Sequence, residues 1–451
     1  MNDTIAAIST ALGVGAISIV RVSGDDSLNI VNKLFKGKDL TKVESHTINY
    51  GFIVDGEKII DEVLVSVMLA PRTFTRENIV EINVHGGIAT TNKVLELLLT
   101  NGCRLAEPGE FTKRAFLNGR IDLIEAEAVM DLINAKTDKS RSLAINQVSG
   151  NVSGLIKNLR QEIVNTLANI EVNIDYPEYE DIEVMTIEMV KGNISSIRNK
   201  ISTILNESEN GKIIKDGIKT VIVGRPNVGK SSILNRLLDE DKAIVTDVAG
   251  TTRDIVEGNI SVDGIMLNMI DTAGIRDTDD IVESIGVKKS LSLIEEADLV
   301  LFVLNNNEEL NEEDKNILNQ IKEKNSIVII NKIDLDNKLD INSIECDNIV
   351  KMSALNNEGI KELKNKIKEL FNLEQIEKGD YTYLSSARSI SLLRKALASL
   401  QEVENGINNN MPIDMIEIDL KDVWNLLGDI TGDNYSDELI DQLFSQFCLG
   451  K

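Results

Sequence analysis

The sequence predicts a multidomain fold with three architectures. These are an α+β domain at the N-terminus, an all-α helical domain, and an inserted α/β domain with a doubly wound, mostly parallel sheet. Short β-like runs fill the first part of the chain, strands and helices alternate in the third, and long amphipathic helices occupy the second and fourth. Because helical stretches flank the alternating part, we expect one helical domain to host it. The expected parts are 1–117, 118–213, 214–375 and 376–451.

Composition favours a soluble, cytoplasmic chain with sizeable cores. Of its 451 residues, 42% are apolar and 27% are charged. No run reaches the ~18 apolar residues that a membrane-spanning helix needs, and the first residues lack the basic region of a signal peptide. Cys103, Cys346 and Cys448 are too scattered for a disulfide framework or a zinc site. The net charge of −25 argues against nonspecific nucleic-acid binding, although an acidic protein can still carry a basic patch.

The N-terminal part reads as strands followed by a helix. Residues 16–22, 63–69 and 79–84 are apolar or alternating runs, each ended by Gly or Pro. Residues 88–100 carry a Leu-rich face and stop at Asn101-Gly102. This order predicts the α+β domain.

The helical parts show apolar residues at helical spacing. The acidic segment 175–183 interrupts them and reads as a solvated interhelix loop. The expected helices are 121–136, 140–174 with a break near 150–154, 186–209, 386–405, 411–427 and 437–447.

The α/β part contains short apolar runs with helical stretches between most of them. Helices are expected at 311–323 and 357–371, and such alternation is typical of a parallel doubly wound sheet. The expected strands are 219–223, 258–263, 265–270, 298–304, 326–330 and 348–352.

A phosphate-binding loop occupies the first strand-to-helix turn of this part. Gly224-Arg-Pro-Asn-Val-Gly-Lys-Ser-Ser232 follows one apolar run and precedes a helix. Its glycines allow backbone N–H groups to turn inward, and the helix N-terminus favours anions. We expect Lys230 to reach the outer phosphates and the Ser231 hydroxyl to ligate Mg²⁺.

Three further motifs follow later strands. Asp271-Thr-Ala-Gly274 places an acidic residue near the metal and a backbone N–H near the γ-phosphate. Asn331-Lys-Ile-Asp334 offers a carboxylate that accepts two hydrogen bonds from guanine, which adenine cannot donate. Ser353-Ala-Leu355 can support the base edge with a backbone N–H. Four motifs in this order predict a GTP-binding domain that resembles translation-factor-related small GTPases.

Hydrolysis requires a replacement for the Gln that positions water in Ras-like GTPases, because Ile275 follows Gly274. Gly250-Thr-Thr-Arg-Asp254 stands where the first switch is expected, with Thr252 as a second Mg²⁺ ligand. Asn227 and Thr251 are placed to coordinate a monovalent cation. The residues expected to contact GTP are Asn227, Val228, Gly229, Lys230, Ser231, Ser232, Thr246, Asp247, Val248, Ala249, Gly250, Thr251, Thr252, Asp271, Thr272, Ala273, Gly274, Asn331, Lys332, Asp334, Ser353, Ala354 and Leu355.

Over its whole length the chain resembles the tRNA modification GTPase family MnmE, also called TrmE. The likeness rests on the phosphate loop, the loop 250–254, Asp271-Thr-Ala-Gly-Ile-Arg276 and the terminal Phe447-Cys-Leu-Gly-Lys451. It implies an N-terminal folate-binding and dimerisation domain. It also implies a K⁺-dependent GTPase activated when two GTPase domains meet, with K⁺ held by Asn227, Thr246, Val248 and Thr251.

The resemblance also implies roles for three catalytic residues. Glu283 would orient water, Arg276 would support the second switch, and Cys448 would lie near the folate with a chemical role. Without the resemblance, Glu283 reads as a carboxylate favoured by a helix N-terminus, and Arg276 as an exposed charge. Cys448 reads as a buried structural thiol in the last helix.

For a tetrahydrofolate derivative (5,10-methylene or 5-formyl), the resemblance implies contacts from Arg21, Glu81, Arg120 and Lys451. Glu81 suits the N–H groups of a pterin, and the cationic side chains suit the glutamate tail or carbonyls. By residue type alone, Arg21 and Glu81 read as strand-surface charges. Position 120 is Arg where well-known relatives have Lys.

The implied activity is formation of 5-carboxymethylaminomethyluridine, or the aminomethyl form, at the tRNA wobble position. The implied partner is an FAD-dependent protein, the assembly is a homodimer within a heterotetramer, and tRNA is held mostly through the complex. Two alternatives are a ribosome-assembly GTPase, which should carry a basic RNA-binding module, and a purely regulatory GTP switch that needs an external activator.

Overall fold

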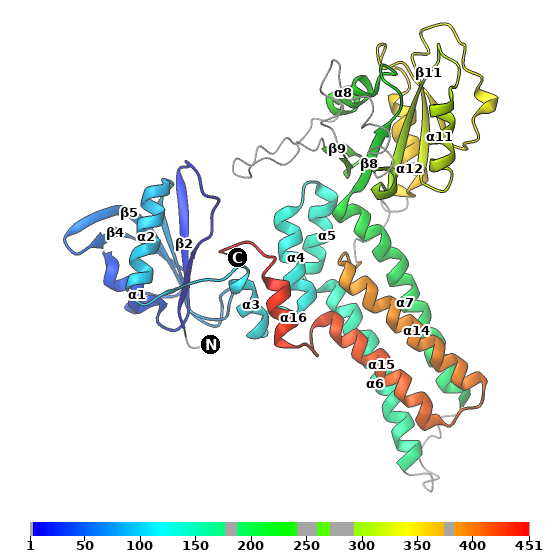
Figure 1. The fold of residues 1–451 in the computed structure, drawn as a ribbon. Coiled ribbons are helices and arrows are strands. Elements are labelled where there is room, and N and C mark those ends of the chain that lie inside the picture. The colour runs from blue at the N-terminus through cyan, green and yellow to red at the C-terminus, as the bar shows by residue number, and fades with distance from the viewer. Residues whose placement is uncertain (1–2, 176–186, 241–258, 271–292, 374–382, 451) are drawn as a thin grey trace. The chain divides into compact units, whose positions relative to one another are not determined.

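The computed structural model describes residues 3–175, 187–240, 259–270, 293–373 and 383–450. The chain forms two compact units (Figure 1). The first comprises Met1–Met130, Ser153–Ile197 and Lys395–Lys451, and the second comprises Asp131–Val152 and Arg198–Arg394. No helix among the described residues is long and apolar enough to cross a membrane.

A seven-stranded sheet forms the N-terminal part of the first unit, in the order β3-β4-β5-β6-β2-β1-β7. All neighbouring strands are antiparallel except the parallel pair β1 and β7. The strands are β1 (Ile5–Ile8), β2 (Ile17–Ser23), β3 (Phe35–Lys36), β4 (Thr47–Asp55), β5 (Lys58–Met68), β6 (Ile79–His85) and β7 (Arg104–Leu105).

One face of this sheet is apolar and packs against two helices, α1 (Ser27–Leu34) and α2 (Ile88–Thr100). Val20 and Val22 of β2 and Val80 and Ile82 of β6 belong to this core. Since side chains alternate along a strand, Arg21 and Glu81 lie on the opposite face. The predicted strands at 16–22 and 79–84 and the helix at 88–100 are confirmed. The strand predicted at 63–69 begins five residues earlier, at Lys58, because β4 and β5 pair as a long hairpin.

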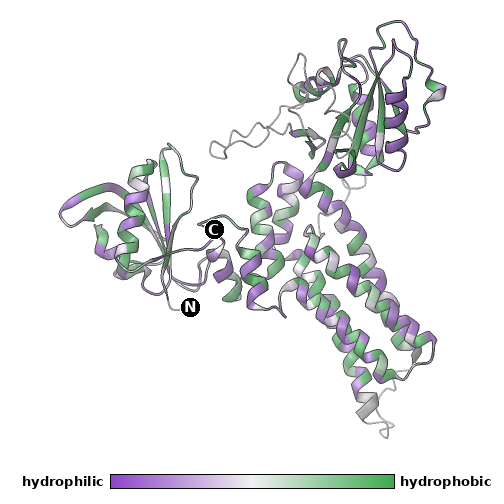
Figure 2. Ribbon diagram, viewed as in Figure 1, coloured by the Kyte–Doolittle hydropathy of each residue, from purple (hydrophilic) through white to green (hydrophobic). Residues whose placement is uncertain are grey.

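Helices complete the first unit, and the long helix α6 buries one stripe of its surface. In α6, Val152, Ile156, Leu159 and Ile163 are buried at the three- and four-residue spacing of a helix face. Figure 2 shows the same alternation of apolar and polar residues along the helices. The helices are α3 (Glu110–Leu117), α4 (Leu123–Asn134), α6 (Asn151–Asp175), α7 (Ile187–Asp216), α14 (Ala387–Asn408), α15 (Ile413–Thr431) and α16 (Asp437–Phe444), of which α4, α6, α7 and α14 also contribute to the second unit.

The second unit contains a six-stranded sheet in the order β13-β12-β11-β8-β10-β9. The pairs are parallel except β9 and β10, which form an antiparallel hairpin. The strands are β8 (Ile218–Val223), β9 (Asn259–Val262), β10 (Ile265–Met269), β11 (Leu299–Asn305), β12 (Ser326–Asn331) and β13 (Ile349–Lys351), and the helices are α5 (Asp138–Val148), α8 (Lys230–Glu240), α11 (Glu312–Ile321) and α12 (Ile360–Leu370).

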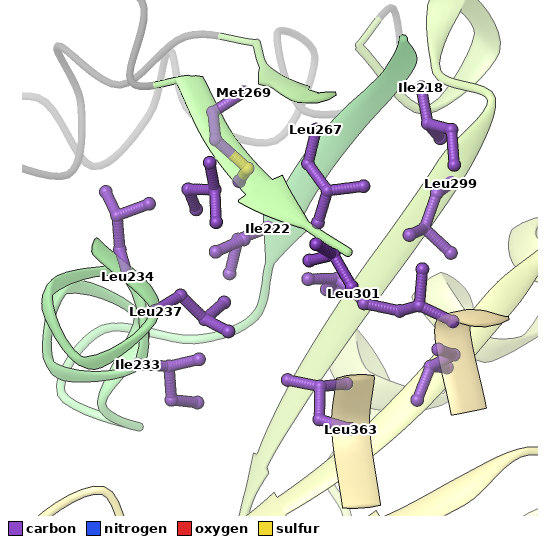
Figure 3. Close-up of a cluster of buried hydrophobic side chains, with 14 of the residues drawn as sticks. Ile218, Ile222, Ile233, Leu234, Leu237, Leu267, Met269, Leu299, Leu301 and Leu363 are labelled. Carbon is purple, nitrogen blue, oxygen red and sulfur yellow. The ribbon is translucent and has the colours of Figure 1, made fainter. Parts of the chain in front are cut away.

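Both faces of this sheet are covered, which makes it doubly wound. Residues of β11 alternate between two clusters, with Leu301 in one and Phe302 in the other. Helices α8 and α12 pack on the first cluster through Leu237 and Leu363, and α11 packs on the second through Leu318. Figure 3 shows Ile233, Leu234 and Leu237 of α8 beside the sheet residues. The α/β architecture predicted from the alternation is therefore confirmed, and no strand bound differs from its predicted position by more than one residue.

Candidate functional site

The phosphate loop lies between the end of β8 at Val223 and the start of α8 at Lys230. Three of its residues have positive φ: Gly224 (145°), Asn227 (61°) and Gly229 (104°). A Cβ on Gly229 would lie 2.1 Å from Asn331 Nδ2, and one on Gly224 would lie 2.4 Å from the carbonyl oxygen of Val303. Only glycine fits at these two positions, which explains the spacing seen in the sequence.

Lys230 reaches back over the loop from the first turn of α8. Its Nζ donates to the carbonyl oxygens of Gly224 at 2.7 Å and Arg225 at 2.8 Å. Burial lowers the pKa of Lys230, because desolvation disfavours the ammonium form. An anion within the loop would replace that lost hydration, which fits a phosphate-binding lysine.

Asn331 joins the phosphate loop to the segment after β13. Its Nδ2 donates to the carbonyl oxygen of Val228 at 2.9 Å, and its Oδ1 accepts from the backbone N–H of Ala354 at 3.1 Å. The side chain is 2% exposed, so both hydrogen bonds are shielded from water. Two of the motifs predicted from the sequence therefore form one polar network with the loop.

The remaining base-site residues lie in the same network. Lys332 Nζ donates to the Asn227 carbonyl oxygen at 2.7 Å, and Ser353 Oγ donates to Asp334 Oδ1 at 2.5 Å. The sequence analysis missed Arg236, whose guanidinium donates to the carbonyl oxygens of Ala354 at 2.9 Å and Leu355 at 3.2 Å. In the sequence, Arg236 is a single Arg within the helix after the phosphate loop. An isolated Arg at such a position does not predict a binding role.

Asn227 and Ser231 are the candidate metal ligands that fall within the described residues. Both are exposed on the loop and the first turn of α8. A carboxamide oxygen and a hydroxyl are hard oxygen donors, which suit Mg²⁺ and K⁺. The other predicted residues lie outside the described part of the chain: Thr246, Asp247, Val248, Ala249, Gly250, Thr251, Thr252, Asp271, Thr272, Ala273, Gly274, Arg276, Glu283 and Lys451.

The predicted folate contacts Arg21 and Glu81 face each other across β2 and β6. Arg21 Nε lies 2.8 Å from Glu81 Oε1, and the two side chains are 20% and 21% exposed. The pair is thus mostly shielded rather than freely solvated, unlike ordinary strand-surface charges.

Two aromatic rings that the sequence pattern did not reveal, Phe111 and Phe74, lie against Arg21 and Arg120. We call these two rings the aromatic floor. The guanidinium carbon of Arg21 lies 5.6 Å from the Phe111 ring centroid, and that of Arg120 lies 5.3 Å from the Phe74 ring centroid. Phe74 and Phe111 belong to one apolar cluster with Ile5, Ala7 and Ala106. Arg21 and Arg120 therefore border one cluster, and Glu81 is paired with Arg21.

The segment after α16 lies against the N-terminal sheet. The Cys448 carbonyl oxygen accepts from the Gly109 N–H at 3.2 Å, and the Gly450 carbonyl oxygen accepts from Ser9 Oγ at 3.0 Å. The alternative of a buried structural thiol at Cys448 is wrong, because that residue is exposed. Helix α16 ends at Phe444, and Phe447 rather than Cys448 packs on it, with ring centroids 5.0 Å apart.

Comparisons with known proteins cover the entire chain. The family model "GTP-binding protein TrmE N-terminus" matches residues 4–120, and "MnmE helical domain" matches residues 123–448. The tRNA modification GTPase MnmE of Streptococcus gordonii is 56% identical over 453 residues, covering 100% of this chain and 99% of the relative. That of Streptococcus thermophilus is 56% identical over 451 residues, covering 100% of this chain and 98% of the relative.

Among solved structures, the FeoB G-domain from Methanococcus jannaschii is 24% identical and covers 34% of this chain and 98% of its own, with a TM-score of 0.26. That score is too low to compare folds. The two family models and the full-length relatives agree with each other, and the chain belongs to the tRNA modification GTPase MnmE family.

Proposed function

We propose that this protein is a K⁺-dependent GTPase that acts in tRNA modification. With an FAD-dependent partner, it would form 5-carboxymethylaminomethyluridine, or the aminomethyl form, at the wobble position. The main observation in support of GTP binding is the hydrogen-bond network in which Asn331 joins the Val228 carbonyl to the Ala354 N–H. This network supports a single site shared by the phosphate loop and the segments proposed to recognise the base.

GTP would be bound by the loop backbone and by Lys230, whose ammonium already lies over the loop carbonyls. Asp334 would accept the guanine N–H groups, and Ser353 orients that carboxylate by donating to it. A purine without those donors would leave the carboxylate unpaired, which supports discrimination by about 10⁴-fold. Magnesium held by Ser231 and Thr252 would neutralise phosphate charge.

The catalytic cation would take the place of an arginine finger, which is worth about 10³- to 10⁵-fold in rate. Exposed Asn227 supports this role within the loop, together with Thr246, Val248 and Thr251. Glu283 would orient the attacking water and Arg276 would support the second switch.

Turnover in K⁺ compared with Na⁺ at equal ionic strength tests this proposal. We expect K⁺ to stimulate hydrolysis and Asn227→Ala to remove the stimulation while nucleotide is still bound. Asn235, exposed on α8, provides a matched control, and Asn235→Ala should keep the stimulation. Equal rates in the two salts would reject the cation.

A tetrahydrofolate derivative would supply the one-carbon unit on the N-terminal sheet. The paired Arg21 and Glu81, with Phe111 beneath the arginine, offer a carboxylate for pterin N–H groups beside an apolar surface. Arg120 and Lys451 would hold the carboxylate end, and exposed Cys448 would lie near the folate. Calorimetric titration with the 5-formyl and 5,10-methylene forms tests this assignment, and Glu81→Gln should weaken both.

The assembly would be a homodimer within a cytoplasmic heterotetramer, with the partner contributing most of the tRNA-binding surface. The net charge of −25 supports this assignment of tRNA binding to the partner.

We also propose that the domains of the chain are the parts 1–117, 118–213, 214–375 and 376–451. A wobble-uridine profile of tRNA from cells lacking this protein tests the overall function, and unchanged modification would reject it. Tight binding of tRNA by this chain alone, with a steep salt dependence, would reject the role given to the partner.

A further inference from the structure

Two loops of the N-terminal unit are tied together beside the aromatic floor. Arg76 Nη1 donates to the Asn118 carbonyl oxygen at 2.8 Å, and Asn118 Nδ2 donates to the Thr75 carbonyl oxygen at 2.6 Å. These reciprocal bonds fix loop 71–77 against loop 118–120. Arg72, Arg76 and Arg120 are all exposed on these two loops, and we call them the arginine patch.

The arginine patch differs from the other arginines of its unit. Arg21, Arg104, Arg114 and Arg160 each form an ion pair with a carboxylate. None of the three patch arginines forms an ion pair within the described residues of the chain. In a protein with a net charge of −25, three exposed arginines on two joined loops, without carboxylate partners among the described residues, indicate a site for an external anion.

Two carboxylates close in sequence to the patch have other hydrogen-bond partners. Glu77, next to Arg76, accepts from Arg114 at 3.1 Å and from Ser23 Oγ at 2.7 Å, and its side chain is 15% exposed. Glu125 interacts with Arg120 only at longer range and accepts from the Asp122 N–H at 2.8 Å. The sequence neighbours of the patch therefore do not neutralise it.

Arg76 adopts a backbone conformation that Arg rarely takes. Its φ of 58° lies in the left-handed region, which Gly or Asn occupies at lower cost. Such strain persists where the surroundings hold it and is concentrated at binding sites.

The patch is continuous with the proposed folate contacts. Arg120 stacks on Phe74, which shares a cluster with Phe111, and Arg21 stacks on Phe111. The anion that binds the patch would thus be attached to a molecule lying on this floor. A nucleic-acid backbone is disfavoured, since affinity for it grows with the number of phosphates neutralised and the protein as a whole carries a net charge of −25.

We propose that the arginine patch binds the γ-linked oligoglutamate tail of a folate, with Arg72 and Arg76 taking the carboxylates beyond the first. This inference rests on the proposed folate function and extends it to the class of substrate. Guanidinium groups suit it because each can bind a carboxylate through two hydrogen bonds. A tail with several carboxylates in series would bind successive arginines.

The test compares the affinities for the monoglutamate and pentaglutamate forms of 5-formyl-tetrahydrofolate, measured by calorimetry at one salt concentration. In the unchanged protein we expect the pentaglutamate to bind about tenfold more tightly, from two exposed charge-assisted contacts. The double variant Arg72→Gln, Arg76→Asn should bring the ratio close to one. Asn is chosen at position 76 because it tolerates the left-handed backbone.

The double variant Arg141→Gln, Arg394→Gln is the control, since it removes the same two charges from exposed arginines that pair with Asp138 and Glu209. It should leave the ratio unchanged. A ratio near one in the unchanged protein, or a ratio that survives the double variant, would overturn the proposal. So would a double variant that weakens tRNA binding while keeping the ratio.

Titration with free γ-linked pentaglutamate separates a failure of the arginine-patch proposal from a failure of the proposed folate function. If the monoglutamate form does not bind, the folate function itself fails. The patch is then supported only if the free pentaglutamate binds and the double variant abolishes that binding. Failure of both ligands rejects both proposals.

Discussion

The phosphate loop and the proposed folate face of the N-terminal sheet are built by different means. In the loop, positive-φ glycines and backbone carbonyls form the site, and few side chains contribute. On the sheet and the adjoining helix α3, side chains make most of the contacts. These are the Arg21–Glu81 pair, two guanidinium groups stacked on aromatic rings, and a buried ionic network around Arg114. We therefore expect the loop to lose ligand affinity when a side-chain atom is added to one of its glycines. We expect the site on the sheet to lose ligand affinity when a charged side chain is removed.

The largest loss of folding stability is expected from Arg114→Met. The guanidinium is 1% exposed and lies 2.8 Å from Asp3, 2.9 Å from Glu110 and 3.1 Å from Glu77. Removing it takes the buried cation away from Glu110, which keeps the half-exposed Arg104, and from Glu77, which keeps the Ser23 hydroxyl, at a cost of about 3 kcal/mol. We expect α3 to lose hydrogen-exchange protection and folate binding to fall, while GTP binding remains.

Arg104→Met is the control for this network, since Arg104 contacts Glu110 at 2.5 Å but is 43% exposed. Its effect should be smaller because solvent screens that charge. Equal losses in the two variants would contradict the importance given to burial.

The next effect concerns atoms added to the phosphate loop. Gly229→Ala places a Cβ 2.1 Å from Asn331 Nδ2 on a residue with φ of 104°. Strain of about 1–3 kcal/mol together with the displaced Asn331 should weaken GTP binding about a hundredfold, as measured with a fluorescent GTP analogue. A Cβ on Gly154 in α6 would meet no atom within 4 Å, so Gly154→Ala should leave GTP affinity unchanged.

A smaller effect is expected when the Asn331 side chain is removed. Asn331→Ala leaves the Val228 carbonyl and the Ala354 N–H without their partner, at a cost of about 1–3 kcal/mol. GTP and GDP affinities should fall together, because the network supports both the loop and the base site. A variant that weakened GTP alone would indicate a role at the γ-phosphate instead.

The smallest effect lies at the end of β6, where His85 Nδ1 is 2.7 Å from Asp61 Oδ1. That hydrogen bond raises the pKa of His85 above 6.5, with a smaller contribution from the charge of Glu62. The stabilisation is therefore full below pH 6.5 and is lost as the pH rises through the raised pKa. His85→Gln should remove this pH dependence from the thermal midpoint, and an NMR titration of His85 should show the raised pKa directly.

The sequence could predict the backbone-built site better than the side-chain-built one. Gly224, Gly229 and Lys230 stand close together in the chain, so their spacing alone indicates the loop and its function. The floor under Arg21 and Arg120 combines Phe74 and Phe111 from separate segments with β1 residues such as Ala7. No local pattern contains that contact. The same reason explains why Arg236 and the start of β5 at Lys58 were missed, since both depend on pairing between segments.

The hydrogen bond between Ser9 and Gly450 joins residues that are 441 positions apart. At a synthesis rate of about 5–20 residues per second, roughly 20–90 s separate the appearance of these two residues. The phosphate loop and all strands of its sheet are made within that interval. A growing chain can therefore complete its nucleotide site before the N-terminal sheet receives its last contact. The order of synthesis thus sets the order in which the two sites mature.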